Sequence, residues 1–263
     1  MPQIAATNLT EKTTSNAGFD PVIFGQLAEI EGDSFWFKGR NKIICWALQK
    51  FFPSTHDFLE IGCGTGFVLT ELARTFPSMK LSGSELFEEG LEFAAKRLPE
   101  ANLFQLDATN IPFEKSFDVI GAFDVLEHIE DDSRVLQQMH KAVRPGGGIL
   151  LTVPQHMFLW SQSDDFAHHC RRYEISELVR KVENAGFKIV VHTSFVSLLL
   201  PLMMLSRLRQ KLFPTDYNVI SELKVVGIVG AMLEAILKLE LTLIKMGISF
   251  PAGGSILMVA RRV

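Results

Sequence analysis

Hydrophobic and polar positions follow two patterns that take turns along the middle of the chain. Short apolar runs are typical of strands buried on both faces, and they alternate with stretches whose apolar residues recur every three or four positions, as on one face of a helix. The runs predict strands at 56–61, 80–85, 102–106, 117–123, 147–153 and 187–192. The stretches between them predict helices at 67–76, 88–97, 131–143 and 175–185. This order predicts an α/β fold, a doubly wound parallel sheet with helices on both faces.

Further helical patterns flank this alternating region. Two short ones at 22–31 and 41–52 precede it, separated by an aromatic cluster that is either a lid over a ligand or a docking patch for the first helix. A long amphipathic helix is expected at 225–246 and a closing strand at 255–260. The pattern divides the chain into an N-terminal tail with lid helices (1–54), a core (55–194), an apolar helical insertion (195–254) and the closing strand of the core (255–263).

Composition narrows the class of protein and its compartment. Hydrophobic residues make up 47% of the 263 positions, which is enough for a sizeable core. The net charge of −4 does not indicate the basic surface that is typical of nucleic-acid-binding proteins. Three scattered cysteines argue against a disulfide framework and favour a reducing compartment. The polar residues 1–20 lack the apolar region of a signal peptide. We expect a cytoplasmic protein without a nucleic-acid partner, and leave open a peripheral contact with the inner face of the membrane.

The sharpest local motif is a set of three alternate glycines between the first strand and the helix after it. Gly62, Gly64 and Gly66 follow an apolar run that contains Glu60. Glycine permits positive φ and a close approach of ligand to backbone, and the N-terminus of the following helix offers unpaired N–H groups. The motif predicts a nucleotide-type site, and a tight turn that merely needs glycine is the alternative.

Acidic residues stand where further strands end. Ligands of doubly wound sheets bind beyond the carboxyl ends of the strands, which singles out Glu85, Asp107 and the pair of Phe123 and Asp124. A carboxylate after the second strand suits the hydroxyls of a ribose, and one after the third suits the exocyclic amine of adenine. Each alone is more often a helix cap or a turn residue, but their order after the glycines predicts an adenosine-containing ligand.

Five motifs in this order resemble those of the class I S-adenosylmethionine-dependent methyltransferases. They are the glycine motif with Glu60, the stretches Gly83-Ser84-Glu85-Leu86 and 106–113, the stretch 117–129 with its Asp-Val-Leu-Glu-His core, and Val143-Arg144-Pro145-Gly146-Gly147. The second motif departs from the family, which normally has Asp where Glu85 stands. The resemblance covers about residues 55 to 153. It implies a Rossmann-like sheet whose last strand runs antiparallel between the fifth and the sixth.

The resemblance also implies the cofactor and its contacts. Carried over by position, S-adenosylmethionine would be bound by Glu60, Gly62, Cys63, Gly64, Gly66, Glu85, Leu86, Asp107, Ala108, Phe123 and Asp124. In that pattern Glu85 holds the ribose, Asp107 reads the edge of adenine, and Phe123 borders the sulfonium.

A polar cluster after the fourth strand supplies candidates for catalysis. Asp124, Glu127 and His128 share one side of the segment if it turns helically. His128 is a candidate general base, because imidazole titrates near neutrality and a hydroxyl nucleophile benefits from losing its proton. The pattern also resembles quinone O-methyltransferases, some of which bind a divalent ion there. We assign no metal ligand at this point, and capping of the next helix is the remaining alternative.

The stretch 160–173 is rich in residue types that mark functional sites and follows the fifth strand on the same edge of the sheet. It resembles the W-S-x-x-D-x-x-x-x-H-x-R-R-Y segment of a bacterial branch of these methyltransferases, in which His169 is the aligned histidine and a second catalytic candidate. The expected substrate-binding residues are Trp36, Arg40, Trp160, Asp164, His168, Arg171, Arg172 and Tyr173. The alternatives are an arginine–aspartate network that only braces the loop, and a zinc site with Cys170 that lacks a recognisable ligand spacing.

The insertion is unusually apolar at its start. Residues 195–205 are too few to span a bilayer, but Arg207, Arg209 and Lys211 follow, so the segment could lie in a membrane interface. Core packing and formation of a homodimer are the alternatives. The same bacterial branch has a characteristic ending that Asn218, Glu240, Pro251, Gly253 and Ser255 echo.

Together these features predict an S-adenosylmethionine-dependent methyltransferase. The expected acceptor is a small or lipid-linked molecule methylated on oxygen, with a prenyl quinone or a lipid-linked sugar as the favoured classes. The alternative is a non-catalytic module that keeps the cofactor fold and binds a partner through its apolar cap, against which the complete cofactor motifs count.

Overall fold

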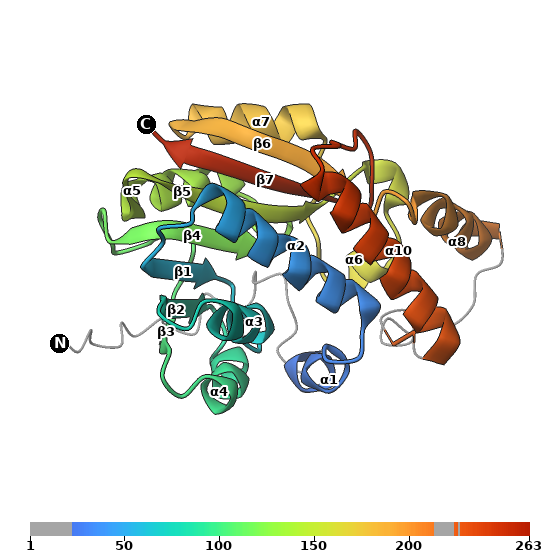
Figure 1. Cartoon of the computed structure of the whole chain (residues 1–263), viewed down its shortest axis with the longest axis horizontal. Coiled ribbons are helices and arrows are strands. Elements are labelled where there is room, and N and C mark those ends of the chain that lie inside the picture. Colours follow the sequence, from blue (N-terminus) through green and yellow to red (C-terminus); the bar gives the residue numbers. More distant parts are fainter. Residues whose placement is uncertain (1–22, 213–223, 226) are drawn as a thin grey trace.

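A single mixed sheet forms the centre of the molecule (Figure 1). The computed structural model describes residues 23–212, 224–225 and 227–263, and the predicted tail and Asn218 lie outside them. Within these residues seven strands lie in the order β3-β2-β1-β4-β5-β7-β6. They are β1 (Asp57–Ile61), β2 (Lys80–Glu85), β3 (Asn102–Gln105), β4 (Phe117–Phe123), β5 (Val143–Pro154), β6 (Phe187–Phe195) and β7 (Ser255–Arg262).

β7 is the strand that runs against its neighbours. The strands from β3 to β5 pair in parallel, whereas β7 pairs antiparallel with β5 on one side and with β6 on the other. β1 lies between β2 and β4, so the strand order reverses beside β1. In sheets of this kind a crevice for ligands opens at that reversal, beyond the carboxyl ends of the strands. The prediction of a Rossmann-like sheet with an antiparallel last strand is confirmed.

The strands separate two hydrophobic cores, one on each face of the sheet. Leu150 belongs to the core covered by the helices at 35–51, 67–75 and 227–245, while its neighbours Ile149 and Leu151 belong to the core covered by the helices at 132–142 and 175–184. This alternation explains why the strands read as continuous apolar runs. The helices are α1 (Ile23–Ile30), α2 (Phe35–Phe51), α3 (Phe67–Thr75), α4 (Glu88–Arg97), α5 (Asp132–Ala142), α6 (Gln162–Phe166), α7 (Ile175–Asn184), α8 (Leu200–Leu212) and α10 (Gly227–Lys245), with short 3-10 turns η2 (Leu126–His128) and η3 (Met157–Leu159).

Three sequence-based boundaries differ from the structure by more than two residues. β5 begins at Val143 rather than at 147, because Val143 already pairs with Phe117 of β4. The second helix begins at Phe35 rather than at 41, so the aromatic cluster forms the first turns of α2 instead of a separate lid. Gly39 lets α2 pack closely against α10, because a Cβ at this position would lie 2.6 Å from Cδ1 of Leu237 on α10. β6 extends to Phe195 instead of 192, since pairing with β7 satisfies its backbone groups beyond the apolar run.

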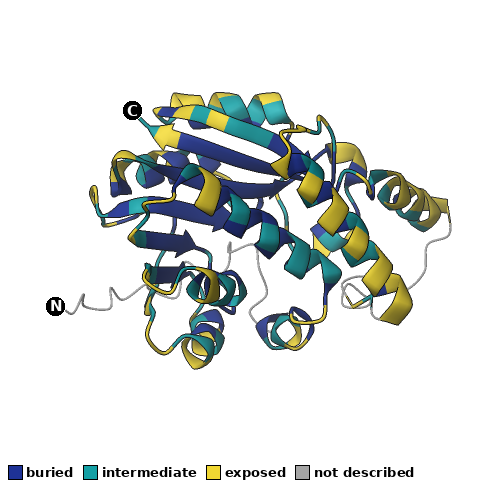
Figure 2. Cartoon of the chain, in the orientation of Figure 1, coloured by how far each residue is buried: buried dark blue, intermediate teal, exposed yellow. Residues whose placement is uncertain are grey.

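The segment between β6 and β7 carries α8 and α10. α10 packs along α2, and the buried carboxylate of its Glu240 accepts hydrogen bonds from the N–H groups of Val196 and Leu198 at 2.5 and 2.7 Å. α8 and much of α10 expose their side chains (Figure 2). None of the described helices combines the length and the hydrophobicity needed to cross a bilayer. The division into four units stays a prediction.

Candidate active site

A cavity of about 600 Å³ opens beyond the carboxyl ends of β1, β2 and β4. The reversal of strand order beside β1 predicts a crevice at this place. Ten of the eleven cofactor candidates are among the described residues that line it: Glu60, Gly62, Cys63, Gly64, Glu85, Leu86, Asp107, Ala108, Phe123 and Asp124. The eleventh, Gly66, faces α4, where a Cβ would lie 3.0 Å from the Cα of Ala94. Gly66 therefore allows α3 and α4 to pack closely.

Glycines shape the cavity wall that follows β1. Gly62 and Gly64 have φ values of +66° and +51°, a conformation that costs most other residues about 1–2 kcal/mol. A Cβ on Gly62 would also lie 2.6 Å from Cγ2 of Val125. The loop is fixed by the N–H of Cys63, which donates to the carbonyl of Ser84 at 2.9 Å. The result is a fixed wall of bare backbone, which a ligand can approach closely.

Glu85 ends β2, and amide groups hold its carboxylate in place. Its Oε2 accepts a hydrogen bond from the N–H of Gly64 at 3.0 Å, and its Oε1 accepts from the N–H groups of Leu86 and Phe87 at 2.7 and 3.3 Å. Burial raises the pKa of this carboxyl, and the three hydrogen bonds oppose the rise. Glu85 thus presents oriented oxygens at the cavity and ties the glycine loop to β2.

Asp107 lies after β3 on the same side of the cavity. Its Oδ1 accepts hydrogen bonds from the N–H and the hydroxyl of Thr109 at 2.8 and 2.7 Å. These bonds within a tight turn fix the carboxylate and leave the neighbouring Ala108 on the cavity wall. The role of this turn in reading the edge of a base stays a prediction.

Arg40 reaches the cavity from α2 and pairs with Asp124, which has a φ of +58°. The Nη1 of Arg40 lies 2.6 Å from Oδ2 of Asp124, and the guanidinium stacks over the Trp36 ring at 4.7 Å from the ring centre. Burial raises the pKa of nearby Glu60 well above its usual range, and the positive charge of Arg40 partly offsets this. Arg40 is therefore a charged wall residue, and Trp36 supports it from outside the cavity lining.

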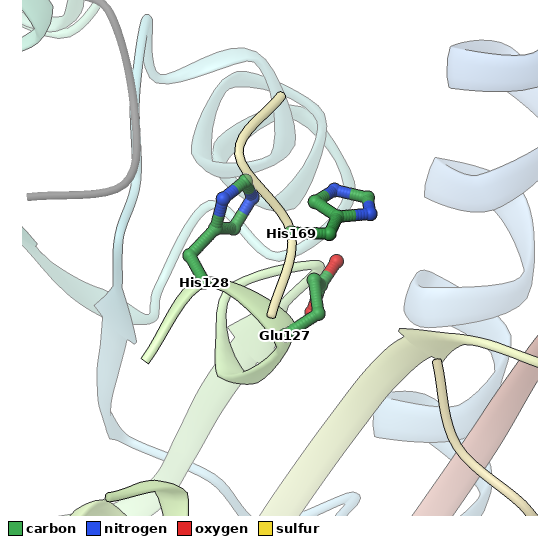
Figure 3. Close-up of side chains that lie close together, drawn as sticks. All are labelled: Glu127, His128 and His169. Atoms are coloured by element: carbon green, nitrogen blue, oxygen red, sulfur yellow. The ribbon is translucent and has the colours of Figure 1, made fainter. Parts of the chain in front are cut away.

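Three side chains that can bind protons or metal ions converge next to this cavity (Figure 3). They are Glu127, His128 and His169, and their donor atoms lie within 4.8 Å of one another. His128 lines the cavity, while Glu127 is fully buried behind it. A backbone hydrogen bond of 2.7 Å from the N–H of Cys170 to the carbonyl of Glu127 joins the two segments. Burial, and then the charge of Asp124, raise the pKa of the Glu127 carboxyl well above its usual range.

This cluster differs from the grouping that the sequence predicted. η2 is a 3-10 turn rather than an α-helical one, and Asp124 points its carboxylate to Arg40. His169 takes its place beside Glu127 and His128, although it comes from a segment about forty residues later. Spacing within one segment could not reveal this contact, because it depends on how two loops meet.

Asp164 is the hub that positions His169. Its Oδ1 lies 2.8 Å from Nδ1 of His169 and 2.7 Å from Nε of Arg172, and its Oδ2 lies 3.0 Å from Nη2 of Arg172. The same oxygen accepts from the N–H of Ser161 at 2.8 Å and so caps α6. Desolvation acts to raise the pKa of Asp164, but the His169 and Arg172 bonds outweigh it and hold the pKa well below its usual range.

A second hub, Asp132, holds the end of the same loop. Its Oδ2 accepts from the Tyr173 hydroxyl at 2.6 Å and lies 2.8 Å from Nη1 of Arg171 and 2.6 Å from Nζ of Lys181. Desolvation acts to raise the pKa of Asp132, but these partners lower it overall. The two hubs together brace the loop against α5 and α7.

The predicted acceptor-binding residues divide into two groups. Arg40 is one of the described residues that line the cavity, and the other seven are not: Trp36, Trp160, Asp164, His168, Arg171, Arg172 and Tyr173. Asp164 and Tyr173 have no exposed surface, and His168 is exposed on the outer side of the loop. Their contact with an acceptor stays a prediction, and their positions favour the alternative that this segment is a brace.

Helix α1 supplies residues of the cavity wall that were not among the predicted site residues. Phe24 and Leu27 line the cavity, and Glu31 lines it while accepting hydrogen bonds from Thr65 at 2.7 Å and Arg97 at 2.8 Å. These bonds fasten α1 to the glycine loop. The helix was predicted, but the residues through which it meets the loop lie far apart in the sequence.

Comparisons with known proteins agree with this geometry. The family model described as a methyltransferase domain matches residues 36–192. A protein of Mycolicibacterium smegmatis named "Probable S-adenosylmethionine-dependent methyltransferase" is 25% identical over 163 residues, which is 60% of this chain and 61% of that protein. The demethylmenaquinone methyltransferase of Thermotoga maritima is 31% identical over 115 residues, 43% of this chain and 49% of that protein. The chain thus spans less than two thirds of the length of these curated relatives.

Solved structures show the same fold. The crystal structure of the [4+2]-cyclase SpnF aligns with 92% of this chain and 93% of its own at a TM-score of 0.63, with 16% sequence identity. At that identity the likeness concerns the fold alone. The family match covers more than half of the residues and includes the glycine loop, the strand-end acids and the histidine cluster. The chain therefore belongs to the S-adenosylmethionine-dependent methyltransferase domain family.

Proposed function

We propose that the protein transfers a methyl group from S-adenosylmethionine to a hydroxyl oxygen of a small, largely hydrophobic acceptor. The observation that carries the choice of oxygen is the cluster of Glu127, His128 and His169 beside the cavity. A hydroxyl is a weak nucleophile until its proton is withdrawn, and this cluster is a place where that can happen.

The residues of the cavity suit the cofactor. The glycine wall, Glu85 and Asp107 would hold its ribose and adenine, in the order that the strands present them. When bound, the cofactor supplies an electrophilic methyl group on a positively charged sulfur. Glu60 and Asp124 place carboxyl groups at the cavity, and Arg40 limits how much negative charge they present. Phe123 and Val125 keep the wall between the glycine loop and the cluster apolar.

The chain's own contribution to the reaction is alignment and proton transfer. Methyl transfer is an in-line displacement, so the protein must hold the acceptor oxygen opposite the leaving sulfur. His128 lies on the cavity wall, where an acceptor hydroxyl would enter. Asp164 fixes His169, and His169 packs edge-on against His128 with ring centres 4.7 Å apart. The side chains that handle the proton are thus held in a fixed arrangement.

The exposed helices of the insertion support a hydrophobic or lipid-linked acceptor. Large apolar side chains of α8 and α10 face solvent. They include Leu202, Met204, Leu205, Leu208, Leu212, Ile228, Val229, Met232 and Leu239. Arg209 and Lys211 accompany them on α8, a combination that favours peripheral contact with an anionic membrane. A homodimer that covers the same surface is the competing explanation.

The methylated product tests the proposed function. Radiolabelled S-adenosylmethionine is incubated with the full chain and a cell extract, and the products are separated into organic and aqueous phases. Label in the organic phase is expected. Label in the aqueous phase would replace the hydrophobic acceptor by a soluble one. Label in neither phase, with cofactor binding shown by calorimetry, would favour a non-catalytic module of the same fold.

Flotation with vesicles tests the membrane contact separately. The full chain is expected to float with anionic vesicles at low salt and to stay at the bottom with neutral ones. Replacing Leu205 and Leu208 with Ser should abolish flotation, because both side chains are more than half exposed. Leu199→Ser is the comparison variant. Leu199 is buried in the core, so its replacement shows how a loss of folding, rather than a change of the exposed surface, affects flotation. Absence of flotation together with a concentration-dependent dimer would assign the surface to self-association.

A further inference from the structure

The side-chain cluster beside the cavity has the composition of a metal site. Glu127, His128 and His169 contribute one carboxylate and two imidazoles, and their donor atoms lie within 4.8 Å of one another. We propose that these three residues bind one divalent transition-metal ion at the edge of the cavity. The proposal deepens the proposed function, on which its catalytic part rests: the ion would bind the acceptor hydroxyl oxygen and promote loss of its proton, and His128 would act as a ligand of the ion rather than as a free base.

Glu127 gives the first independent support. Its side chain has no exposed surface, and neither carboxylate oxygen has a hydrogen-bond partner among the residues that the structure describes. Buried polar groups are nearly always paired, because an unpaired one loses its hydrogen bonds to water and gains none in the protein. A buried carboxyl aimed at two imidazoles (Figure 3) is explained if a cation completes the group.

The environment of His169 gives the second support. Its Nδ1 lies 2.8 Å from Oδ1 of Asp164, which is itself fixed by the two bonds to Arg172. A histidine that ligates a metal typically donates its other ring N–H to a carboxylate, which sets the tautomer and aims the free nitrogen. Asp164 thus leaves Nε2 of His169 as the donor atom for an ion. This also gives the buried Asp164–Arg172 pair a purpose beyond bracing the loop.

The three side chains must close around the ion. Zinc binds imidazole nitrogen and carboxylate oxygen at about 2.0–2.2 Å in tetrahedral geometry, so two of its ligand atoms lie about 3.4 Å apart. The donor atoms here lie within 4.8 Å, which side-chain rotation can reduce. The two imidazole rings pack edge-on with their centres 4.7 Å apart.

The chemical types of the three ligands indicate which class of ion the site would prefer. Two imidazoles favour zinc and its first-row neighbours over magnesium, which prefers oxygen ligands. Three protein ligands leave at least one coordination position open, as in catalytic rather than structural sites. His128 lines the cavity, so the open position is accessible to an acceptor.

The open coordination position defines the chemical step that the ion would assist. The acceptor oxygen would bind the ion, and its proton would leave to solvent because the ion stabilises the anion. The oxygen–methyl bond then forms as the sulfur–methyl bond breaks, and the electron pair of the broken bond stays on sulfur as a neutral thioether. Asp124 remains outside the ligand set, held by Arg40 at 2.6 Å.

Metal binding is measured without reference to activity. The purified full chain is stripped with a chelator and titrated with Zn²⁺ in a calorimeter, with Mn²⁺ and Mg²⁺ as comparison ions. One Zn²⁺ per chain is expected, with Mg²⁺ binding much more weakly. Glu127→Gln and His169→Gln should each weaken Zn²⁺ binding roughly 10- to 100-fold or more. Asp164→Asn should weaken it about tenfold, the usual scale for a residue that orients a ligand.

His168→Asn is the matched control. His168 is the neighbouring histidine but lies outside the cluster and is exposed, and Asn tolerates its φ of +53°. This variant should bind Zn²⁺ as the unchanged chain does. No stoichiometric ion, or an ion whose affinity falls in His168→Asn but not in Glu127→Gln, would overturn the proposal. Thermal melting of each variant separates loss of binding from loss of fold.

Binding of S-adenosylmethionine to the stripped chain separates this proposal from the proposed function. Binding of the cofactor with no metal ion would leave the methyltransferase assignment intact and reject only the metal site. Binding of Zn²⁺ without binding of the cofactor would leave the metal site intact and reject the proposed methyl transfer.

Discussion

The buried pair of Asp164 and Arg172 allows one stability prediction to be worked out in detail. Asp164 has no exposed surface, and the Arg172 side chain is 7% exposed. Replacing Asp164 with Asn preserves the shape but removes the charge that two hydrogen bonds of Arg172 depend on. Breaking a buried ion pair by removing one partner costs about 3–5 kcal/mol, because the other charge remains buried and unpaired. We therefore expect Asp164→Asn to lower the free energy of unfolding by that amount.

Urea denaturation followed by circular dichroism measures the effect. With a slope of about 3 kcal/mol/M, the midpoint should fall by roughly 1 to 1.7 M. The double variant Asp164→Leu with Arg172→Met should be more stable than Asp164→Asn, because no charge is left unpaired. His168→Asn, on the exposed side of the same loop, should change stability by less than about 0.5 kcal/mol. A loss below about 1 kcal/mol in Asp164→Asn would refute the view that the pair braces the loop.

Three further predictions follow from single contacts. Asp107→Ala should weaken binding of S-adenosylmethionine by about 1–3 kcal/mol in calorimetry, the cost of an unpaired polar group, and unchanged affinity would remove Asp107 from the adenine site. Gly62→Ala should weaken cofactor binding as well, because its φ of +66° and the 2.6 Å approach to Val125 would force the loop to move; a crystal structure with an unmoved loop would contradict this. Hydrogen bonds from two lysines lower the pKa of Glu234 to about 2. The stability that it contributes is therefore present above its ordinary pKa of about 4.5 and is lost as the pH falls toward 2, so Glu234→Gln should flatten the acid side of the stability profile, by a small amount because the pair is partly exposed.

The sequence by itself determined the fold and the cofactor side of the cavity. The periods of apolar residues specify strands and helices, and the order of those elements specifies a doubly wound sheet. The glycines and acids at the strand ends could be recognised because each acts close to its own strand. The parallel pairing of β1, β2 and β3 brings the ends of these strands to the same edge of the sheet. Local sequence was therefore enough to place Gly62, Glu85 and Asp107 together.

Only the tertiary structure decided what the polar residues outside those strand ends do. Asp124 was expected beside His128, yet its partner is Arg40 from α2, while His169 joins His128 and Glu127 from a distant loop. Charged side chains are long, and each can satisfy its hydrogen bonds in several ways, so their partners depend on which loops the packed core brings together. Apolar periodicity carries no information about that choice, because hydrophobic burial fixes where elements lie and leaves the pairing of polar groups to local geometry.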